Sequence, residues 1–302
     1  MTSHFRFLDL DARRELDGID QFFPEWRVGK EENVVVLSPH DDDGILGAGY
    51  AILASLSQGA QVHVVIFHKG DAGYSIPSDK ESIVETRKHE TVKAYRTLGI
   101  QPEHVLRLEV PDFSGNAYVG KSRPVRDGED ASLGTFEQLL VFLRKTRATR
   151  LLLANGFREH IDHVAVADSG IYYGPQAGDP VVVDWADPWP ITSFMEYSVW
   201  GDFDPVETIR RGAWSPGSGN RILPANRAIV ACETSERLVQ QSLRAFASQQ
   251  AIIKGILEQR QERRINDGGF IELYMDIDPR PRLDYQPYKN IIEEIGRGRI
   301  KK

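Results

Sequence analysis

The order of apolar and polar positions along the chain predicts alternating strands and helices. Short apolar runs, which are typical of strands buried on both faces, occur at Asn33–Ser38, Val62–Phe67, Val105–Val110 and Arg150–Ala154, and the first of them is rich in β-branched residues. Segments with helical spacing of apolar residues lie between or after them, at Gly47–Ser57, Ser82–Leu98, Thr135–Lys145 and His163–Tyr173. This alternation predicts an α/β protein with a three-layer, Rossmann-like fold, in which helices cover both faces of a mostly parallel sheet.

The remaining segments carry weaker signals. We expect a helix around Asp11–Phe22, a strand at Ser193–Trp200 and one long helix at Ser235–Leu257. Two stretches rich in glycine and proline, 112–133 and 174–190, predict long loops around the active site, since loops of this length are usually functional. We expect one domain over 1–302, with a core of about 33–250 and a C-terminal extension, 251–302.

Composition limits the classes of protein that need considering. Hydrophobic residues make up 41% of the 302 residues and charged residues 27%, which excludes global disorder. The net charge of -7 argues against a nucleic-acid partner. The longest apolar runs are strand-sized, and no apolar signal region follows the N-terminus, so we expect no membrane span and a cytoplasmic protein. Because Cys232 is the one cysteine, a disulfide framework and a multi-cysteine metal site are excluded.

Two clusters of histidine and aspartate come directly after two of the predicted strands. His40-Asp41-Asp42-Asp43 follows the first strand and His160-Ile161-Asp162-His163 follows the fourth. Parallel α/β sheets bind ligands outside the carboxyl ends of their strands, so we expect both clusters at one edge. Alone, the aspartates could simply cap the next helix and the histidines could lie on the surface. Together they offer the histidine and carboxylate ligands of a catalytic metal site, which leaves one position for water.

These motifs resemble those of the LmbE-like, or PIG-L-like, zinc-dependent N-deacetylases, whose two motifs are His-Pro-Asp-Asp and His-x-Asp-His. Weaker similarities follow in the family's order along the chain, at Gly70–Gly73, Glu85–Glu90 and Ser242–Gln249. The resemblance covers roughly Val34 to Gln250.

The resemblance implies a role for each motif residue. His40, Asp43 and His163 would bind Zn²⁺, or another divalent metal. Asp42 would be the general base that takes the proton of the attacking water, His160 would stabilise the oxyanion, and Asp162 would orient a histidine.

Several positions stay open at this stage. Arg87 either contacts substrate oxygens or pairs with a carboxylate on its own helix, and Asp71 is a second candidate for substrate binding. Asp41 stands where the family usually has proline, so the roles of three adjacent aspartates are ambiguous, although the spacing favours Asp42 as base. His68 ends the second predicted strand and could line the site, whereas His63 within that strand is more simply a packed residue.

The activity implied by the resemblance is removal of the acetyl group from an N-acetylated sugar or sugar conjugate of the GlcNAc type. This small molecule would be the main partner, and relatives commonly assemble, so a homo-oligomer is also implied. An alternative on the same scaffold is a metal-dependent hydratase or another amide hydrolase. A nucleotide-binding module is disfavoured, because the Gly-x-Gly-x-x-Gly order is absent and the aspartates would repel phosphate. A non-catalytic carbohydrate-binding protein is disfavoured by the intact ligand residues.

Overall fold

The computed structural model describes residues 4–27, 31–121, 134–180, 182–200, 203, 225–266, 268–280, 290 and 294. Within these residues, nine strands form one mixed sheet in the order β2-β1-β8-β9-β7-β6-β3-β4-β5. The strands are β1 (Phe5–Asp9), β2 (Arg14–Leu16), β3 (Asn33–Ser38), β4 (Gln61–His68), β5 (Val105–Val110), β6 (Arg150–Ala154), β7 (Ser193–Tyr197), β8 (Arg227–Ala231) and β9 (Phe270–Ile277).

The parallel half of the sheet runs from β7 through β6, β3 and β4 to β5. Successive side chains of β3 point to opposite faces of the sheet. Val34 and Val36 join one hydrophobic core, while Val35 and Leu37 join another. Because every residue of β3 is buried, its sequence is a continuous apolar run rather than an alternating one. The four strands predicted from such runs are confirmed.

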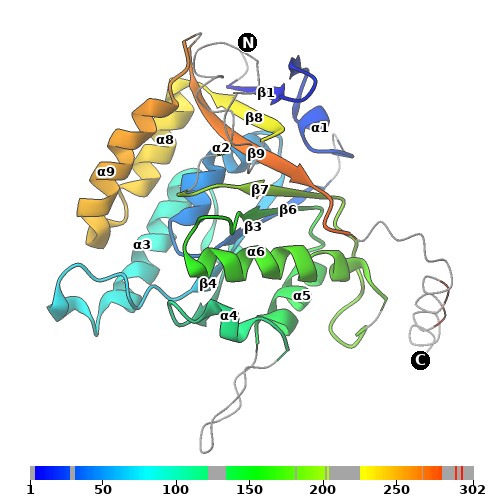
Figure 1. Cartoon of the computed structure of the whole chain (residues 1–302), viewed down its shortest axis with the longest axis horizontal. Helices are drawn as coiled ribbons and strands as arrows, with labels where there is room; N and C mark the ends of the chain where they lie inside the picture. The colour runs from blue at the N-terminus through cyan, green and yellow to red at the C-terminus, as the bar shows by residue number, and fades with distance from the viewer. Residues whose placement is uncertain are drawn as a thin grey trace, which may run out of the picture.

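Helices cover both faces of the sheet, which confirms the three-layer architecture (Figure 1). One face carries α2 (Asp43–Ser57), α3 (Ile83–Leu98), α8 (Glu233–Leu243) and α9 (Gln250–Arg260), and the other carries α4 (Gly115–Tyr118), α5 (Thr135–Lys145) and α6 (Ile161–Tyr173). A further short helix, α1 (Ile19–Phe22), lies beside the N-terminal strands. Among the described residues, no helix combines the length and apolarity needed to cross a bilayer.

Helix α2 lies unusually close to the sheet. A Cβ atom at Gly47 would lie 2.2 Å from Cδ2 of Tyr197 and 2.7 Å from the carbonyl oxygen of Ser198. Glycine at this position therefore lets the first turns of α2 approach the end of β7. This approach brings the aspartates at the start of α2 toward the loops that follow β6 and β7.

The N-terminal segment differs from the prediction, and the helix expected over Asp11–Phe22 is wrong. Residues 5–16 instead form the hairpin of β1 and β2, and only Ile19–Phe22 is helical. The turn begins where a carboxylate oxygen of Asp9 accepts the N–H of Ala12 at 2.9 Å. β1 also pairs with β8, more than 200 residues later, and this remote pairing outweighs the weak helical pattern.

The long helix expected over Ser235–Leu257 is also wrong, because the chain breaks it into α8 and α9. At the break, Glu90 of α3 accepts hydrogen bonds from the backbone N–H and the hydroxyl of Ser248, both at 2.7 Å. Gln249 donates to the carbonyl of Gly73. These bonds to remote parts of the chain stop the helix at a point that local propensity does not mark.

A buried charged network fastens the C-terminal helices and β9 to α2. Arg260, which is 2% exposed, donates to Glu236 at 2.6 and 2.9 Å and to the carbonyl oxygen of Leu46 at 3.2 Å. It also lies 3.4 Å from Glu272 of β9, whose other oxygen accepts the backbone N–H of Tyr50 at 2.8 Å. Since ions cannot be left unpaired in an interior, this network specifies how α2, α8, α9 and β9 meet.

Replacing Arg260 with leucine is expected to lower the free energy of unfolding by about 3–5 kcal/mol, because Glu236 would lose its buried counter-charge and Glu272 would keep only its ion pair with Arg263. The matched control is Arg237→Leu on α8, whose ion pair with Glu233 is exposed and 3.8 Å long. Removing it should cost about 0–1 kcal/mol. Urea denaturation measures both values, and equal losses would show that the network does not hold the domain together.

Candidate metal and catalytic site

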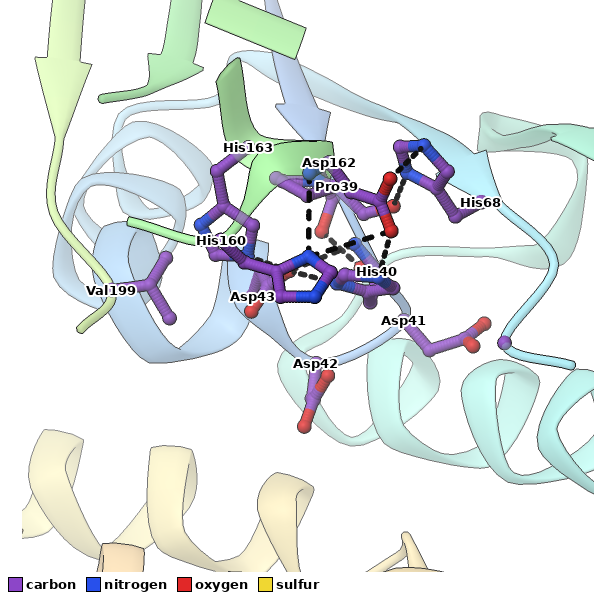
Figure 2. A network of polar contacts seen from close by, with 12 residues as sticks. Pro39, His40, Asp41, Asp42, Asp43, His68, His160, Asp162, His163 and Val199 are labelled. Atoms are coloured by element: carbon purple, nitrogen blue, oxygen red, sulfur yellow. Dashed lines mark hydrogen bonds and ion pairs between the residues drawn. The ribbon is translucent and has the colours of Figure 1, made fainter. Parts of the chain in front are cut away.

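The loops after four parallel strands converge at one edge of the sheet. The loop after β3 carries His40, β4 ends at His68, the loop after β5 carries Phe113, and the loop after β6 leads to Asp162 on α6. The clusters predicted from the sequence meet there, with Nε2 of His40 3.3 Å from Oδ2 of Asp162 (Figure 2). The parallel arrangement brings together side chains 122 positions apart.

His40, Asp43 and His163 form a compact trio whose donor atoms lie within 4.8 Å of one another. Oδ2 of Asp43 is 3.0 Å from Nδ1 of His40 and 3.2 Å from Nε2 of His163. The same oxygen accepts the backbone N–H of His40 at 2.8 Å, so the loop curls tightly onto the first residue of α2. Burial opposes ionisation of Asp43, but the charge of the His163 imidazole beside it, and then the hydrogen bond from His40, hold the pKa of its carboxyl well below the ordinary value.

The environment of His163 fits a metal ligand. Its Nδ1 is 2.8 Å from Oε2 of Glu159, which orients the ring, while its Nε2 is buried and has no hydrogen-bond partner. A buried nitrogen without a partner is costly unless an ion or another donor completes it, and carboxylate–histidine pairs behind a metal are common. Our sequence reasoning missed Glu159, although a glutamate four positions before a candidate ligand at a helix start is a usable signal.

Glu159 is itself fixed by the chain that leaves β7. Its carboxylate accepts the backbone N–H groups of Val199 and Trp200, each at 3.0 Å, and the hydroxyl of Ser198 at 3.0 Å. The orientation of His163 therefore depends on a segment of the loop region that follows β7.

A second trio shares His40. The donor atoms of His40, His160 and Asp162 also lie within 4.8 Å of one another. Asp162 is completely buried, and its Oδ2 accepts the backbone N–H of Phe113 at 2.9 Å and lies 3.5 Å from Nδ1 of His160. Burial alone would raise the pKa of Asp162, but the hydrogen bonds from His40 and Phe113 lower it to about 2. Asp162 thus serves as an acceptor that several groups share.

The three adjacent aspartates have different surroundings. Asp41 is completely buried and accepts hydrogen bonds from Nε of Arg87 at 2.9 Å, from Thr91 at 2.6 Å and from Arg107. Asp42 points away from the imidazoles (Figure 2), and its side chain makes only a 3.5 Å contact, with Arg87, among the described residues. Burial, and then the charge of Asp43, raises the pKa of Asp42. The extra aspartate of the motif is thus the buried anchor of the loop.

The two residues predicted to bind substrate lie in the supporting structure. The guanidinium of Arg87 pairs with Asp41 and Asp42, neither of which lies on its own helix, and its side chain is 6% exposed. Asp71 accepts the backbone N–H of Asp112 at 2.9 Å and pairs with Lys69 at 3.0 Å.

The weaker motif similarities form one scaffold behind the site. Asp112 accepts the N–H groups of Gly70 and Ala72, both at 2.9 Å, which shapes the loop after β4. A Cβ atom at Gly73 would lie 2.5 Å from Nη1 of Arg87, so this loop packs directly on the arginine that holds the aspartates. Gln249 donates to the carbonyl of Gly73 from the late helical segment.

The segment that carries both histidine–aspartate clusters matches a known protein family. Residues 35–172, which include both clusters, match the model of the PIG-L family, described as GlcNAc-PI de-N-acetylase. Residues 35–172 belong to the PIG-L family. From this match the chain is an enzyme, and its class is that of the hydrolases that act on amides. Sequence comparison with curated proteins gives no significant match.

Solved structures share the fold of this chain at low sequence identity. N,N′-diacetylchitobiose deacetylase from Pyrococcus horikoshii is 15% identical with a TM-score of 0.59, over 85% of this chain and 88% of that chain. A conserved protein of Thermus thermophilus is 19% identical with a TM-score of 0.58, over 83% and 97%. GalB, the 4-carboxy-2-hydroxymuconate hydratase of Pseudomonas putida, is 16% identical with a TM-score of 0.56, over 84% and 99%.

The surroundings of the aspartates predict that two neighbouring substitutions change stability by very different amounts. Asp41→Asn should lower the free energy of unfolding by about 3–5 kcal/mol, because it leaves two largely buried arginines without their shared counter-charge. Asp42→Asn should change it by less than about 1 kcal/mol, since the ion pair of Asp42 with Arg87 is long, at 3.5 Å, and Arg87 keeps its shorter pair with Asp41. Chemical denaturation at neutral pH tests both, and similar losses for the two variants would contradict the assignment of Asp41 as the anchor.

Proposed function

We propose that this chain is a zinc-dependent hydrolase that removes the acetyl group from an N-acetylated sugar or sugar conjugate of the GlcNAc type. The observation that carries the proposal is the buried Nε2 of His163, which has no hydrogen-bond partner and lies beside Asp43 and His40. The PIG-L family match supports the reaction type.

His40, Asp43 and His163 would hold the metal, as two imidazoles and one carboxylate. This donor set suits a catalytic zinc site, which keeps a position open for water, and it would accept another divalent ion as well. When bound, zinc polarises a carbonyl and lowers the pKa of water to near neutrality. We prefer this trio to the one containing Asp162, because it contains His163, whose ring Glu159 orients from behind at 2.8 Å.

Two residues beside this trio would handle the proton and the developing charge. Asp42 follows the ligand loop, its side chain is 14% exposed, and its carboxylate is not part of the trio. It is therefore available to take a proton from the attacking water. The side chain of His160 is 33% exposed, and its Nδ1 lies near Asp162. Its other nitrogen can then face the substrate and stabilise the oxyanion of the tetrahedral intermediate.

The rim of the site offers apolar surface for a sugar. Large exposed side chains near His160 are Phe113 (63%), Trp200 (54%), Ile161 (49%) and Phe157 (42%). The ring of Phe113 lies 4.7 Å from that of His160, although its backbone has a φ of 62°, which is unfavourable for a side chain of this size. Such strain is often found at binding sites, and exposed aromatic rings can pack against the apolar face of a sugar ring.

Asp42→Asn is expected to reduce acetate release from N-acetylated amino sugars by at least about 100-fold, which is the usual contribution of a general base. Zinc content should stay unchanged, because Asp42 is not in the ligand trio. Removing zinc with a chelator should abolish acetate release, and adding zinc should restore it.

The matched control is Asp20→Asn, at an exposed aspartate that precedes both motifs in the chain. The screen includes unsaturated carboxylic acids alongside the acetylated sugars. Metal-dependent hydration of these acids without acetate release, or full acetate release by Asp42→Asn, would overturn the proposal.

Glu159→Gln should weaken zinc binding by about 10- to 100-fold, because a neutral amide orients and polarises His163 less strongly than a carboxylate does. Competition with a chromophoric chelator measures this affinity without any substrate. Glu137→Gln, at the start of α5, is the control at another helix start. Unchanged affinity in Glu159→Gln would contradict the assignment of His163 as a ligand.

A further inference from the structure

His68 lies at the centre of the site but belongs to neither motif. It is the last residue of β4, and its side chain is completely buried. Its ring centroid is 5.3 Å from that of His40. A polar side chain with no exposure needs a physical reason for its place, and its contacts supply one.

The imidazole of His68 connects the two motif loops. Its Nδ1 lies 2.9 Å from the carbonyl oxygen of Pro39, which also accepts the backbone N–H of His68 at 3.0 Å. Its Nε2 lies 3.2 Å from Oδ1 of Asp162, a close contact that is not a hydrogen bond. Figure 2 shows the ring beside the Asp162 carboxylate. One side chain from a third strand thus contacts the residue before His40 and the central carboxylate of the second motif.

The packing around this ring leaves it little freedom. A Cβ atom at Gly115 would lie 2.5 Å from Nε2 of His68 and 2.7 Å from Cβ of Ala165. Helix α4 therefore approaches the imidazole with no side chain between them, and Ala165 of α6 lies beside the same point. A substituent at Gly115 could fit only if the ring moved, so the ring and its two oxygen partners are fixed together.

The two carboxylate oxygens of Asp162 contact different groups. Oδ1 faces His68, whereas Oδ2 accepts the N–H of Phe113 and faces His40 at 3.3 Å and His160 at 3.5 Å. Rotation of this carboxylate would remove its contacts with both of these histidines at once.

From this division of contacts we infer that His68 is a positioning residue. Its tightly packed ring, with Nε2 against Oδ1, limits rotation of the Asp162 carboxylate, so that Oδ2 faces His40 and His160. The inference about orientation stands on geometry alone, and only its consequence for metal binding rests on the proposed function. Both nitrogens of His68 face an acceptor oxygen, so the contact that the site uses can be separated from the other by substitution.

The variants His68→Gln and His68→Asn separate the contact with Asp162 from the contact with Pro39. The glutamine amide can occupy the place of Nε2 against Oδ1 of Asp162, whereas the shorter asparagine amide reaches only the place of Nδ1, beside Pro39, and leaves space next to Asp162. The matched control is His63→Gln, at a buried histidine of the same strand whose Nδ1 lies 3.2 Å from Nδ1 of His104. Crystal structures of the variants report the orientation of Asp162, and titration with Co²⁺ reports the affinity and the geometry of the ligands from its absorption spectrum.

We expect Asp162 to keep its orientation in His68→Gln and to rotate in His68→Asn. Co²⁺ affinity should fall by about 10- to 100-fold in His68→Asn, stay near wild type in His68→Gln, and be unchanged in His63→Gln. If His68→Asn does not fold, the glutamine variant decides the inference, because a rotated Asp162 or weakened Co²⁺ binding there overturns it.

An unrotated Asp162 in His68→Asn also overturns the inference. Failure of the wild-type protein to bind Co²⁺ would instead count against the proposed function, and the orientation of Asp162 in the variant structures would still decide the role of His68.

Discussion

The site depends on one constraint, which is that every carboxylate buried at the carboxyl edge of the sheet needs its own partners. Asp41 is paired with Arg87 and Arg107, Asp43 lies between two imidazoles, and Asp162 accepts a backbone N–H beside three histidines. Without these partners, adjacent negative charges in a poorly solvated place would repel one another and raise their own pKa values. The distinct partners give neighbouring aspartates distinct roles.

The rest of the domain supplies those partners from separate directions. The parallel strands bring four loops to one edge, and the loop after β4 packs on Arg87, which in turn holds Asp41. Elsewhere at this edge, Glu159 ties His163 to the chain leaving β7. The buried network of Arg260 fixes α2 against the C-terminal elements. The arrangement of the candidate site is therefore a property of the whole sheet, because its positioning groups come from strands and helices on both sides.

Much of the parallel half could be predicted from the chain, because its signals are local. A strand buried on both faces is a continuous apolar run, as in β3 and β6, and the motif residues come directly after such runs. The antiparallel half could not be predicted in the same way. β1 is stabilised by pairing with β8, and the break between α8 and α9 is stabilised by Glu90 and Gly73, all remote in sequence.

The sequence by itself determined the fold class, the two histidine–aspartate clusters and their place at the ends of parallel strands. It did so because hydrophobic periodicity and residue chemistry are properties of short segments. Only the tertiary structure decided that Asp41 is the buried anchor, that Arg87 supports the aspartates and that Glu159 and His68 stand behind the site. Each of these roles depends on a partner that another loop or helix brings within about 3 Å, and hydrogen-bond reach across such distances is set by packing rather than by local sequence.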